Sequence, residues 1–352
     1  MNLSDLLLIL GSSDRRDGRN LTNAEAYRAF SVILDGAESE IRIGAFLMAM
    51  RWKGVTVEEL NGFAQAARER ATIPCQGMPG LVCVCPSHDG YDTVPPLEVA
   101  AGLIAAGAGS RVLLISERRV PPKRGLTAAS ALEELGCGFT WDPQEAQARV
   151  EATRFAGVAA SGMLPALLSL RRVRGEVGVR TPLSTVEKLI APSTAAVVLG
   201  AQHGPVLGVA VETMVGLGHS NGIAIQGLGG GTIPTLKKRT RGIELHGSHQ
   251  VPLTVEPQDF GLTDGVDPEL PLFSPPVDGE GTDDNPLLIK AAADTIQSVL
   301  HGEISPARSA SILGAAVILK AGGRAPTLAE GVDQAIESLE SGAAMAVWKK
   351  QT

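Results

Sequence analysis

Residues 81–115 decide the fold, and they read LVCVCPSHDGYDTVPPLEVAAGLIAAGAGSRVLLI. Leu81–Cys85 is a short apolar run between Gly80 and Pro86, and this pattern predicts a buried strand. Small residues dominate 95–108 and predict a closely packed helix, and a second strand is expected at 111–115. A strand, a helix and a second strand in this order predict a parallel β-α-β unit.

The same alternation continues towards the C-terminus. After the first unit, elements are predicted at 127–135 (helix), 157–160 (strand), 195–200 (strand), 204–217 (helix), 222–226 (strand), 286–300 (helix), 306–320 (helix) and 327–349 (helix). Residues 262–286 are rich in Pro, Gly and Asp and read as a surface loop. On the N-terminal side, residues 1–72 read as helices, with Thr22 and Glu25 spaced as a capping box. The fold is therefore expected to be α/β, with a small helical domain and a large domain whose mainly parallel sheet is flanked by helices.

The composition excludes several classes of protein. The chain has 352 residues, of which 44% are hydrophobic but only 3% aromatic, and its formal net charge is -7. No apolar run reaches the roughly 18 residues that a membrane-spanning helix needs, and Leu6–Leu10 reads as part of a helix without the basic start of a signal peptide. We therefore expect a cytoplasmic protein that does not contact membranes. The negative charge argues against a general nucleic-acid coat but leaves room for a local basic surface.

Cysteine and histidine spacing gives no metal motif. The four cysteines are expected to be reduced core residues of a cytosolic protein; they are Cys75, Cys83, Cys85 and Cys137. His246 and His249 are too sparse alone to predict a metal site. No Ser-His-Asp or Cys-His arrangement can be argued from spacing, so no catalytic residue is predicted.

Four segments resemble one family along almost the whole chain. They are Leu21–Ala26, Ile43–Gly54, Glu256–Leu262 and Leu328–Ala335. The chain resembles the anthranilate phosphoribosyltransferases, in the superfamily of glycosyltransferase family 3. The resemblance implies the class-three fold of phosphoribosyltransferases and nucleoside phosphorylases. It also implies a helical domain at 1–72, joined by helices from about 165–190, and an α/β domain formed by 73–164 and 191–352.

Relatives of this type form homodimers through the helical domain. In the helix predicted at 41–50, we expect Ile43, Phe46, Leu47 and Met50 to supply an apolar surface for such a dimer.

The family's functional motifs are altered in this sequence. Where relatives carry a glycine-rich loop that cradles pyrophosphate, this chain has a degenerate loop of Pro86, Ser87, His88, Asp89 and Gly90. Proline has no N–H to offer, and side chains prevent the close approach of a ligand to the backbone. The family's Ser-Thr turn falls at 96–99, where Glu98 would repel a phosphate. The family's pair of acidic magnesium ligands falls within Leu228–Ile233, which contains no carboxylate.

We therefore expect no cofactor, no metal and no anthranilate phosphoribosyltransferase activity. Part of the acceptor-side pattern of the family survives at Arg174 and Gly178–Thr181, although the family's Asn is Ser184. Pro86–Gly90, Gly178–Arg180 and the Lys188–Leu189 pair, followed by Ala191–Pro192, look like the YbiB-type proteins. Those proteins are dimeric relatives without the phosphoribosyl loop, and the studied member binds nucleic acid.

Two other features suggest ligands. The run Gly229, Gly230, Gly231 and Thr232 follows a predicted strand, and it reads either as a phosphate loop or as a flexible turn. Basic residues fall in three runs: Arg118, Arg119, Lys123 and Arg124; Arg171, Arg172, Arg174 and Arg180; Lys237, Lys238, Arg239 and Arg241. Each run reads either as a solvated face or as part of a cleft that attracts polyanions.

The leading hypothesis is an atypical family member with a dismantled phosphoribosyl diphosphate and magnesium site, which binds DNA, RNA or another polyanion in a basic cleft. Two alternatives remain open. One is an active glycosyl- or phosphoribosyltransferase with an unknown acceptor, and the other is a regulatory homodimer without catalytic activity.

Overall fold

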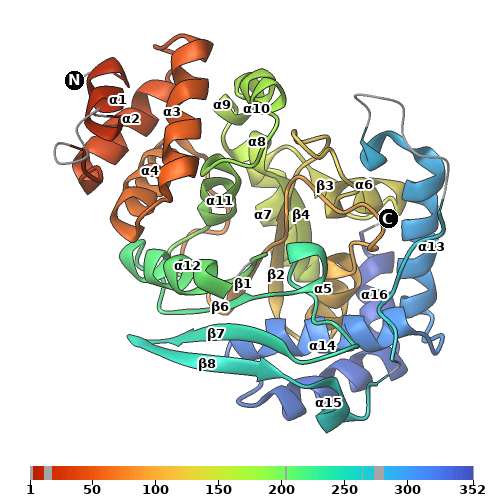
Figure 1. The fold of residues 1–352 in the computed structure, drawn as a ribbon. Helices are drawn as coiled ribbons and strands as arrows, with labels where there is room; N and C mark the ends of the chain where they lie inside the picture. Colours follow the sequence, from red (N-terminus) through yellow and green to blue (C-terminus); the bar gives the residue numbers. More distant parts are fainter. Residues whose placement is uncertain (1–2, 12–17, 203, 264, 273–280, 352) are drawn as a thin grey trace.

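The computed structural model describes residues 3–11, 18–202, 204–263, 265–272 and 281–351 (Figure 1). Its N-terminal part is a bundle of helices α1 (Leu3–Leu10), α2 (Asn23–Leu34), α3 (Glu40–Lys53) and α4 (Val57–Arg70). The Thr22 side chain accepts a hydrogen bond from the Glu25 backbone N–H, and the Glu25 carboxylate accepts one from the Thr22 backbone N–H, so the predicted capping box begins α2.

Within the described residues, eight strands form one sheet in the order β3-β4-β2-β1-β5-β6-β7-β8. The strands are β1 (Leu81–Cys85), β2 (Arg111–Ser116), β3 (Phe139–Thr140), β4 (Phe155–Ala159), β5 (Ala196–Gly200), β6 (Asn221–Ile225), β7 (Thr240–His246) and β8 (His249–Val255). The pairs from β3 to β6 are parallel, whereas β6–β7 and β7–β8 are antiparallel. The sheet is therefore mainly parallel, as the sequence predicts, with an antiparallel hairpin at one edge.

Strand β1 contacts the apolar clusters on both faces of the sheet. Leu81, Cys83 and Cys85 belong to the apolar cluster that also contains the N-terminal helices, whereas Val82 and Val84 belong to the cluster on the opposite face. Alternate side chains of a strand point to opposite faces, so both faces of β1 are covered and every residue in it is buried.

Helices cover both faces of the sheet (Figure 1). They are α5 (Glu98–Gly107), α6 (Ala128–Glu134), α7 (Pro143–Thr153), α8 (Ala160–Met163), α9 (Ala166–Ser169), α10 (Arg171–Val177), α11 (Leu183–Val186), α12 (Gly204–Gly216), α13 (Pro286–Leu300), α14 (Pro306–Ala321), α15 (Leu328–Glu340) and α16 (Ala343–Lys349). Short 3-10 helices are η1 (Glu187–Leu189), η2 (Leu228–Gly230), η3 (Pro257–Phe260) and η4 (Thr282–Asp284). Helix α10 packs against α3, and both α11 and α12 pack against α4.

Several elements differ from the sequence prediction. The β7–β8 hairpin, β3 and α7 were not expected from the pattern. The single helix predicted at 327–349 is two helices, because Ser341 and Gly342 separate α15 from α16 and Gly342 has a φ of 76°. No helix in the described part of the chain has both the length and the apolar character needed to cross a lipid bilayer.

Candidate functional site

The loop after β1, which the sequence analysis compared with a pyrophosphate loop, is buried from Pro86 to Gly90. Ser87 Oγ donates to Asp89 Oδ1 at 2.7 Å, and Asp89 also accepts from Arg180 Nε at 2.6 Å and Nη2 at 2.8 Å. Burial alone would raise the Asp89 pKa, but the bonds from Arg180 hold this pKa below its ordinary value. Asp89 is therefore an ionised carboxylate whose charge is already neutralised by Arg180.

Backbone N–H groups at the end of this loop donate hydrogen bonds to carbonyl groups of the protein itself. The Gly90 N–H donates to the Ser87 carbonyl at 3.1 Å, and the Tyr91 N–H donates to the Leu126 carbonyl at 2.8 Å. Gly90 has a φ of 73°, and a Cβ there would lie 2.2 Å from the Gly125 carbonyl oxygen. Close packing against residues 125–126 thus explains the glycine at position 90.

A second group of polar side chains lies beneath this loop. Arg174 is buried and binds Glu187 through Nη1 at 2.5 Å, while its Nε donates to the Pro121 carbonyl at 3.0 Å. His88 Nδ1 lies 3.7 Å from Glu187 Oε1, and burial lowers the His88 pKa, so the imidazole is neutral at pH 7. Arg174, which the sequence analysis grouped with a basic surface run, is therefore an internal ion-pair partner.

The first turn of α5 contains a buried carboxyl group. Glu98 Oε1 accepts from Tyr91 Oη at 2.5 Å and from the Thr232 backbone N–H at 3.1 Å. Burial raises the pKa of Glu98, and it raises the pKa of Tyr91 well above its ordinary value. The glycine run is part of the same contact, since a Cβ on Gly231 would lie 2.0 Å from Tyr91 Oη.

The glycine run is consequently a tightly packed turn. Gly230, Gly231 and Thr232 are buried, and η2 begins at Leu228. Gly229 has a φ of 59°, and a Cβ on it would lie 2.7 Å from the Tyr91 ring. Within the run Gly229 is exposed, but the Thr232 N–H is not available to a ligand because it donates to Glu98.

The first basic run is matched by carboxylates from distant parts of the chain. Its ion pairs include Arg118 with Glu133 at 2.6 Å and Asp283 at 3.6 Å, Arg119 with Asp284 at 2.6 Å, and Lys123 with Asp92 at 3.2 Å. The Arg124 carbonyl accepts from the Asp283 N–H at 3.1 Å, which ties η4 to this run.

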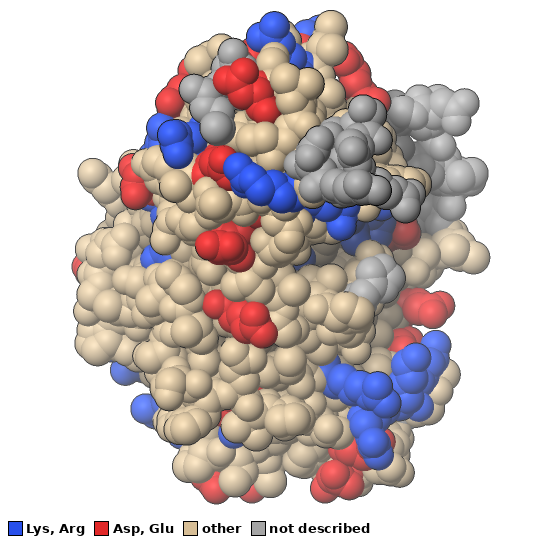
Figure 2. Space-filling model, turned by 60° about the vertical axis from the view of Figure 1, so that its left-hand side comes forward, with Lys and Arg blue, Asp and Glu red and all other residues tan. Residues whose placement is uncertain are grey.

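The other three arginines of the second run also form ion pairs with carboxylates. Arg171 binds Glu117 at 3.0 Å, Arg172 binds Glu40, and Arg180 binds Asp89 as described above. On the face drawn in Figure 2, Lys and Arg side chains are mixed with Asp and Glu side chains in the upper part and form a separate group at the lower right, so they do not make one continuous basic field.

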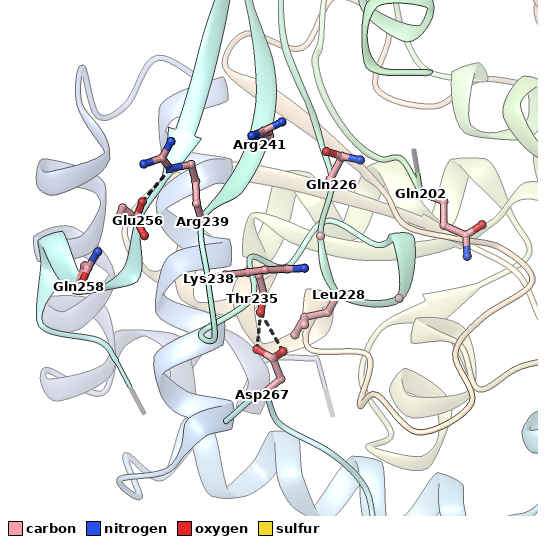
Figure 3. A pocket seen from close by; sticks show the side chains of 12 residues that line it. Gln202, Gln226, Leu228, Thr235, Lys238, Arg239, Arg241, Glu256, Gln258 and Asp267 are labelled. Carbon is pink, nitrogen blue, oxygen red and sulfur yellow. Dashed lines mark hydrogen bonds and ion pairs between the residues drawn. The ribbon is translucent and has the colours of Figure 1, made fainter. Parts of the chain in front are cut away.

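The third run borders the larger of two clefts at the carboxyl ends of the parallel strands. This cleft has a volume of about 830 Å³ and lies beside the loop after β6 and the start of β7. Its polar lining includes Gln202, Gln226, Lys238, Arg239, Arg241, Glu256, Gln258 and Asp267. Figure 3 shows Lys238 extending into the cleft, whereas Arg239 turns towards Glu256.

The cations of this run differ in their partners. Arg239 Nε lies 2.9 Å from Glu256, and Lys237 lies 3.9 Å from both Asp267 and Glu269. Lys238 and Arg241 are exposed, and neither has a carboxylate within ion-pair distance in the described part of the chain. Of the residues predicted as a polyanion site, these two are therefore the best placed to hold an anion.

A smaller cavity of about 430 Å³ lies between the N-terminal helices and the sheet. Ser87, Arg180 and Lys188 line it, and Gln202 lines both cavities. Sequence reasoning did not select Lys188 or the glutamines as site residues. Lys188 directly precedes the apolar residues 189–191, and a lysine beside such a run is a signal that could have drawn attention to it, whereas the glutamines carry no such signal.

The remaining histidines and cysteines do not gather into a metal site. Among the described residues, no group of three or more His, Cys, Asp or Glu side chains could hold a metal ion. The four cysteines are buried and unpaired by disulfides, and burial raises the pKa of Cys75, Cys85 and Cys137 to about 12.

Comparisons with known proteins give a consistent result. Residues 14–71 match the model of the glycosyl transferase family helical bundle domain, and residues 89–345 match that of the glycosyl transferase family a/b domain. The anthranilate phosphoribosyltransferase of Methanosphaerula palustris is 30% identical over 93% of this chain and 92% of its own length. That of Bacillus mycoides is 29% identical over 94% of this chain and 92% of its own length.

Solved structures agree with these sequence matches. Anthranilate phosphoribosyltransferase from Thermus thermophilus superposes with a TM-score of 0.81 at 25% identity, covering 100% of this chain and 98% of that one. The enzyme from Saccharomyces cerevisiae, solved in complex with PRPP and Mg, gives a TM-score of 0.79 at 17% identity, covering 99% of this chain and 96% of that one. At 17% identity, the similarity to the Saccharomyces cerevisiae enzyme shows a shared fold alone.

Proposed function

The chain belongs to the glycosyl transferase family that pairs a helical bundle domain with an a/b domain, and we propose that it is an anthranilate phosphoribosyltransferase-like member that binds nucleic acid in place of phosphoribosyl diphosphate. In this proposal the phosphoribosyl diphosphate and magnesium site is closed by the protein's own side chains. Nucleic acid is held by its phosphates at the cleft beside Lys238 and Arg241.

The observation that carries the first half is the position of Glu98. The N-terminus of a helix favours anions, and by the family resemblance the first turn of α5 is where relatives bind phosphate. Here the Glu98 carboxyl group lies in that turn and accepts hydrogen bonds from Tyr91 and Thr232. A ligand phosphate at this place would meet a buried acidic group, because Glu98 is only 1% exposed.

The oxygen ligands available near Glu98 also argue against a magnesium site. Mg²⁺ prefers several oxygen ligands in octahedral geometry, commonly carboxylates together with phosphate and water. Leu228–Ile233, where the family's acidic pair falls by the resemblance, contains no carboxylate in this chain. The nearby carboxyl group is Glu98, whose Oε1 already accepts two hydrogen bonds and whose pKa is raised by burial. These residues do not fit a magnesium ion, and we derive no reaction step through one.

The proposed binding of nucleic acid is supported by Lys238 and Arg241 and by the cleft in which they lie. Lys238 and Arg241 are exposed beside amides from Gln226 and Gln258, in a cleft at the ligand side of the sheet. Lysine and arginine contribute to nucleic-acid affinity mainly through phosphates. Because the other basic runs are largely matched by carboxylates, the expected footprint is small, and binding should be weak and salt-sensitive.

The experiment is a fluorescence anisotropy titration with labelled duplex DNA, single-stranded DNA and single-stranded RNA across a salt series. The test variant is Lys238→Ala with Arg241→Ala. The control is Arg149→Ala with Lys290→Ala, which removes the same charge from exposed i,i+4 ion pairs on α7 and α13. For duplex DNA, the test variant should flatten the log–log salt slope by about 1.8, since each phosphate contact contributes about 0.9. The control should leave the slope unchanged.

Two results would overturn the proposal. One is the absence of binding to all three nucleic acids at about 50 mM salt, where phosphate contacts are strongest. The other is saturable binding of phosphoribosyl diphosphate with magnesium in a calorimetric titration, which would show that the family's site is open. Binding that survives in the test variant would place the nucleic acid elsewhere on the surface.

A further inference from the structure

The smaller cavity has one apolar wall and one polar wall. Apolar side chains line it from α3, β5 and α12, including Met50, Leu199, Val206 and Ala210. Hydroxyl groups of Ser87, Thr181, Ser184 and Thr185 line it as well, together with Arg51, Arg180 and Lys188. With a volume of about 430 Å³, it can enclose a small organic molecule.

Lys188 is the unusual group in this lining. It lies in η1, and its Nζ donates to the Gly200 carbonyl at 3.1 Å. No carboxylate in the described part of the chain lies within ion-pair distance of Nζ. The two carboxylates whose charges act on it, Asp89 and Glu187, are held by Arg180 and Arg174 respectively. The amine therefore meets the cavity without a counter-ion of its own.

This environment favours the neutral amine. Burial lowers the pKa of the Lys188 ammonium below its ordinary value, and Arg180 lowers this pKa further. Asp89, Glu187 and Cys85 act in the opposite direction without reversing the shift. The Cys85 thiol is protonated at neutral pH, because burial raises its pKa to about 12. Arg51 is a third cation of the lining beside Lys188 and Arg180; it donates to the Arg180 backbone carbonyl and is exposed.

We propose that Lys188 is a nucleophilic amine that captures a small aldehyde or ketone bearing an anionic group, as a reversible imine. The lone pair of Nζ adds to the carbonyl carbon, and the carbonyl oxygen takes up a proton from the nitrogen. The resulting hydroxyl group leaves as water with a second proton when the C=N bond forms, so the step needs no oxidant or reductant. Arg51 supplies the positive charge for the ligand's anionic group, and the Ser184 and Thr185 hydroxyls border the place where water forms.

The test uses glyoxylate, a small anionic aldehyde, with cyanoborohydride to trap imines on the intact protein. Peptide mass spectrometry then measures the rate of modification at each lysine. At about pH 7, Lys188 should react faster than Lys238 and Lys290, because its lowered pKa leaves a larger share of the amine neutral. The difference should shrink as pH rises towards 10, where the surface amines also lose their protons. The neutral analogue acetaldehyde should show a smaller preference for Lys188.

Lys188→Arg keeps a long basic side chain and removes the nucleophilic amine, and Lys290→Arg is the matched control. Circular dichroism checks that each variant is folded. The Lys188→Arg protein should lose the fast phase of trapping, and the control should keep it. Equal trapping rates at Lys188 and the surface lysines in the wild-type protein would overturn the proposal, and this measurement does not depend on the folding of any variant. The outcome is also independent of nucleic-acid binding, which concerns the other cavity.

Discussion

Close contacts, and not a requirement for backbone flexibility, explain why position 231 is a glycine. A Cβ at this residue would lie 2.0 Å from Tyr91 Oη and 2.5 Å from Glu98 Oε1. Both atoms belong to buried side chains that are hydrogen-bonded to each other, so neither can retreat cheaply. The contact between the glycine run and Glu98 therefore depends on the absence of a side chain at position 231.

Gly231→Ala is expected to lower the free energy of unfolding by about 2–3 kcal/mol, because an added methyl group overpacks this contact. Urea denaturation measures the change. Tyr91→Phe, which removes the clashing hydroxyl, should recover part of the loss in the double variant. Gly208→Ala is the control, since a Cβ there meets nothing within 4 Å in the interior of α12. That change should raise stability by up to about 1 kcal/mol. Equal effects of the two alanines would contradict the packing argument.

Asp283 is a fully buried carboxyl group that links η4 to the first basic run. It accepts from the Arg119 backbone N–H at 3.1 Å and lies 3.6 Å from Arg118 Nε. Burial raises the Asp283 pKa from 3.8 to about 6, although Arg118 and the hydrogen bonds oppose the rise. The folded protein thus holds the Asp283 proton more tightly than the unfolded chain does.

Stability should consequently depend on pH through this residue. Because the folded-state pKa is raised, the stabilising contribution is fully present below about pH 4 and is lost as pH rises through about 6. Comparison with Asp283→Asn isolates the effect, since the amide does not titrate. Relative to the variant, the wild-type protein should lose on the order of 3 kcal/mol of unfolding free energy between pH 4 and pH 7. Urea titrations at several pH values measure this, and parallel pH curves for the two proteins would refute the assignment.

At the scale of elements, the strands with clear patterns could be predicted from the sequence. Leu81–Cys85 and 112–115 are continuous apolar runs, and both became buried parts of parallel strands. Small residues at 95–108 likewise predicted α5, which begins a few residues later at Glu98. In each case local pattern and tertiary burial agree, so the sequence was sufficient.

The β7–β8 hairpin was missed because its pattern is mixed. His246 and His249 pair across a two-residue turn formed by Gly247 and Ser248, and a Gly-containing pair at such a position is a hairpin signal. Pro252 argues against a central strand, but β8 is an edge strand, where proline is tolerated. The sequence held the turn signal, whereas the edge position became known only from the sheet order.

The site was less predictable than the fold for a physical reason. Charge runs are local in sequence, but their neutralisation is not. Arg118 and Arg119 meet Asp283 and Asp284, more than 160 positions later in the chain, and Lys123 meets Asp92 on another loop. No local pattern distinguishes these paired cations from Lys238 and Arg241. The side chains of Pro86–Gly90 could be read from the sequence, whereas the contact of Glu98 with Thr232 required the fold.

At the scale of the whole molecule, the exposed face of α3 differs from the one expected. Ile43, Phe46, Leu47 and Met50 are at most 3% exposed, because they fill the core of the N-terminal helices. They cannot form a dimer surface, and that expectation was wrong. The opposite stripe of α3 is exposed instead, and it consists of Ile41, Ala45, Met48 and Trp52. Ile41 is 86% exposed and Trp52 is 91% exposed.

We propose that a second copy of the chain covers this stripe. The spacing of 41, 45, 48 and 52 is the a/d spacing of helices that pack along their length, and a groove of about 330 Å³ between α3 and α10 lies beside it. Helix α3 has Glu40 in its first turn and basic residues in its last turn. A two-fold axis across α3 would pair the helices antiparallel and set Glu40 against the partner's Arg51, so the face is complementary to itself in charge as well as in apolar character.

Replacing Ile41 and Trp52 together by Glu should therefore convert a dimer into a folded monomer. Both side chains are exposed in the single chain, so the substitution adds charge to the interface without disturbing the core. Light scattering coupled to size exclusion measures the mass, and circular dichroism confirms folding. The control places Glu at Leu287 and Ile304, which are 60% and 95% exposed on and beside α13. The control protein should remain a dimer, because its charges lie away from α3. A wild-type protein that elutes with the mass of one chain at micromolar concentration would rule out this interface, whereas a dimer that persists in the α3 variant would move it to another face.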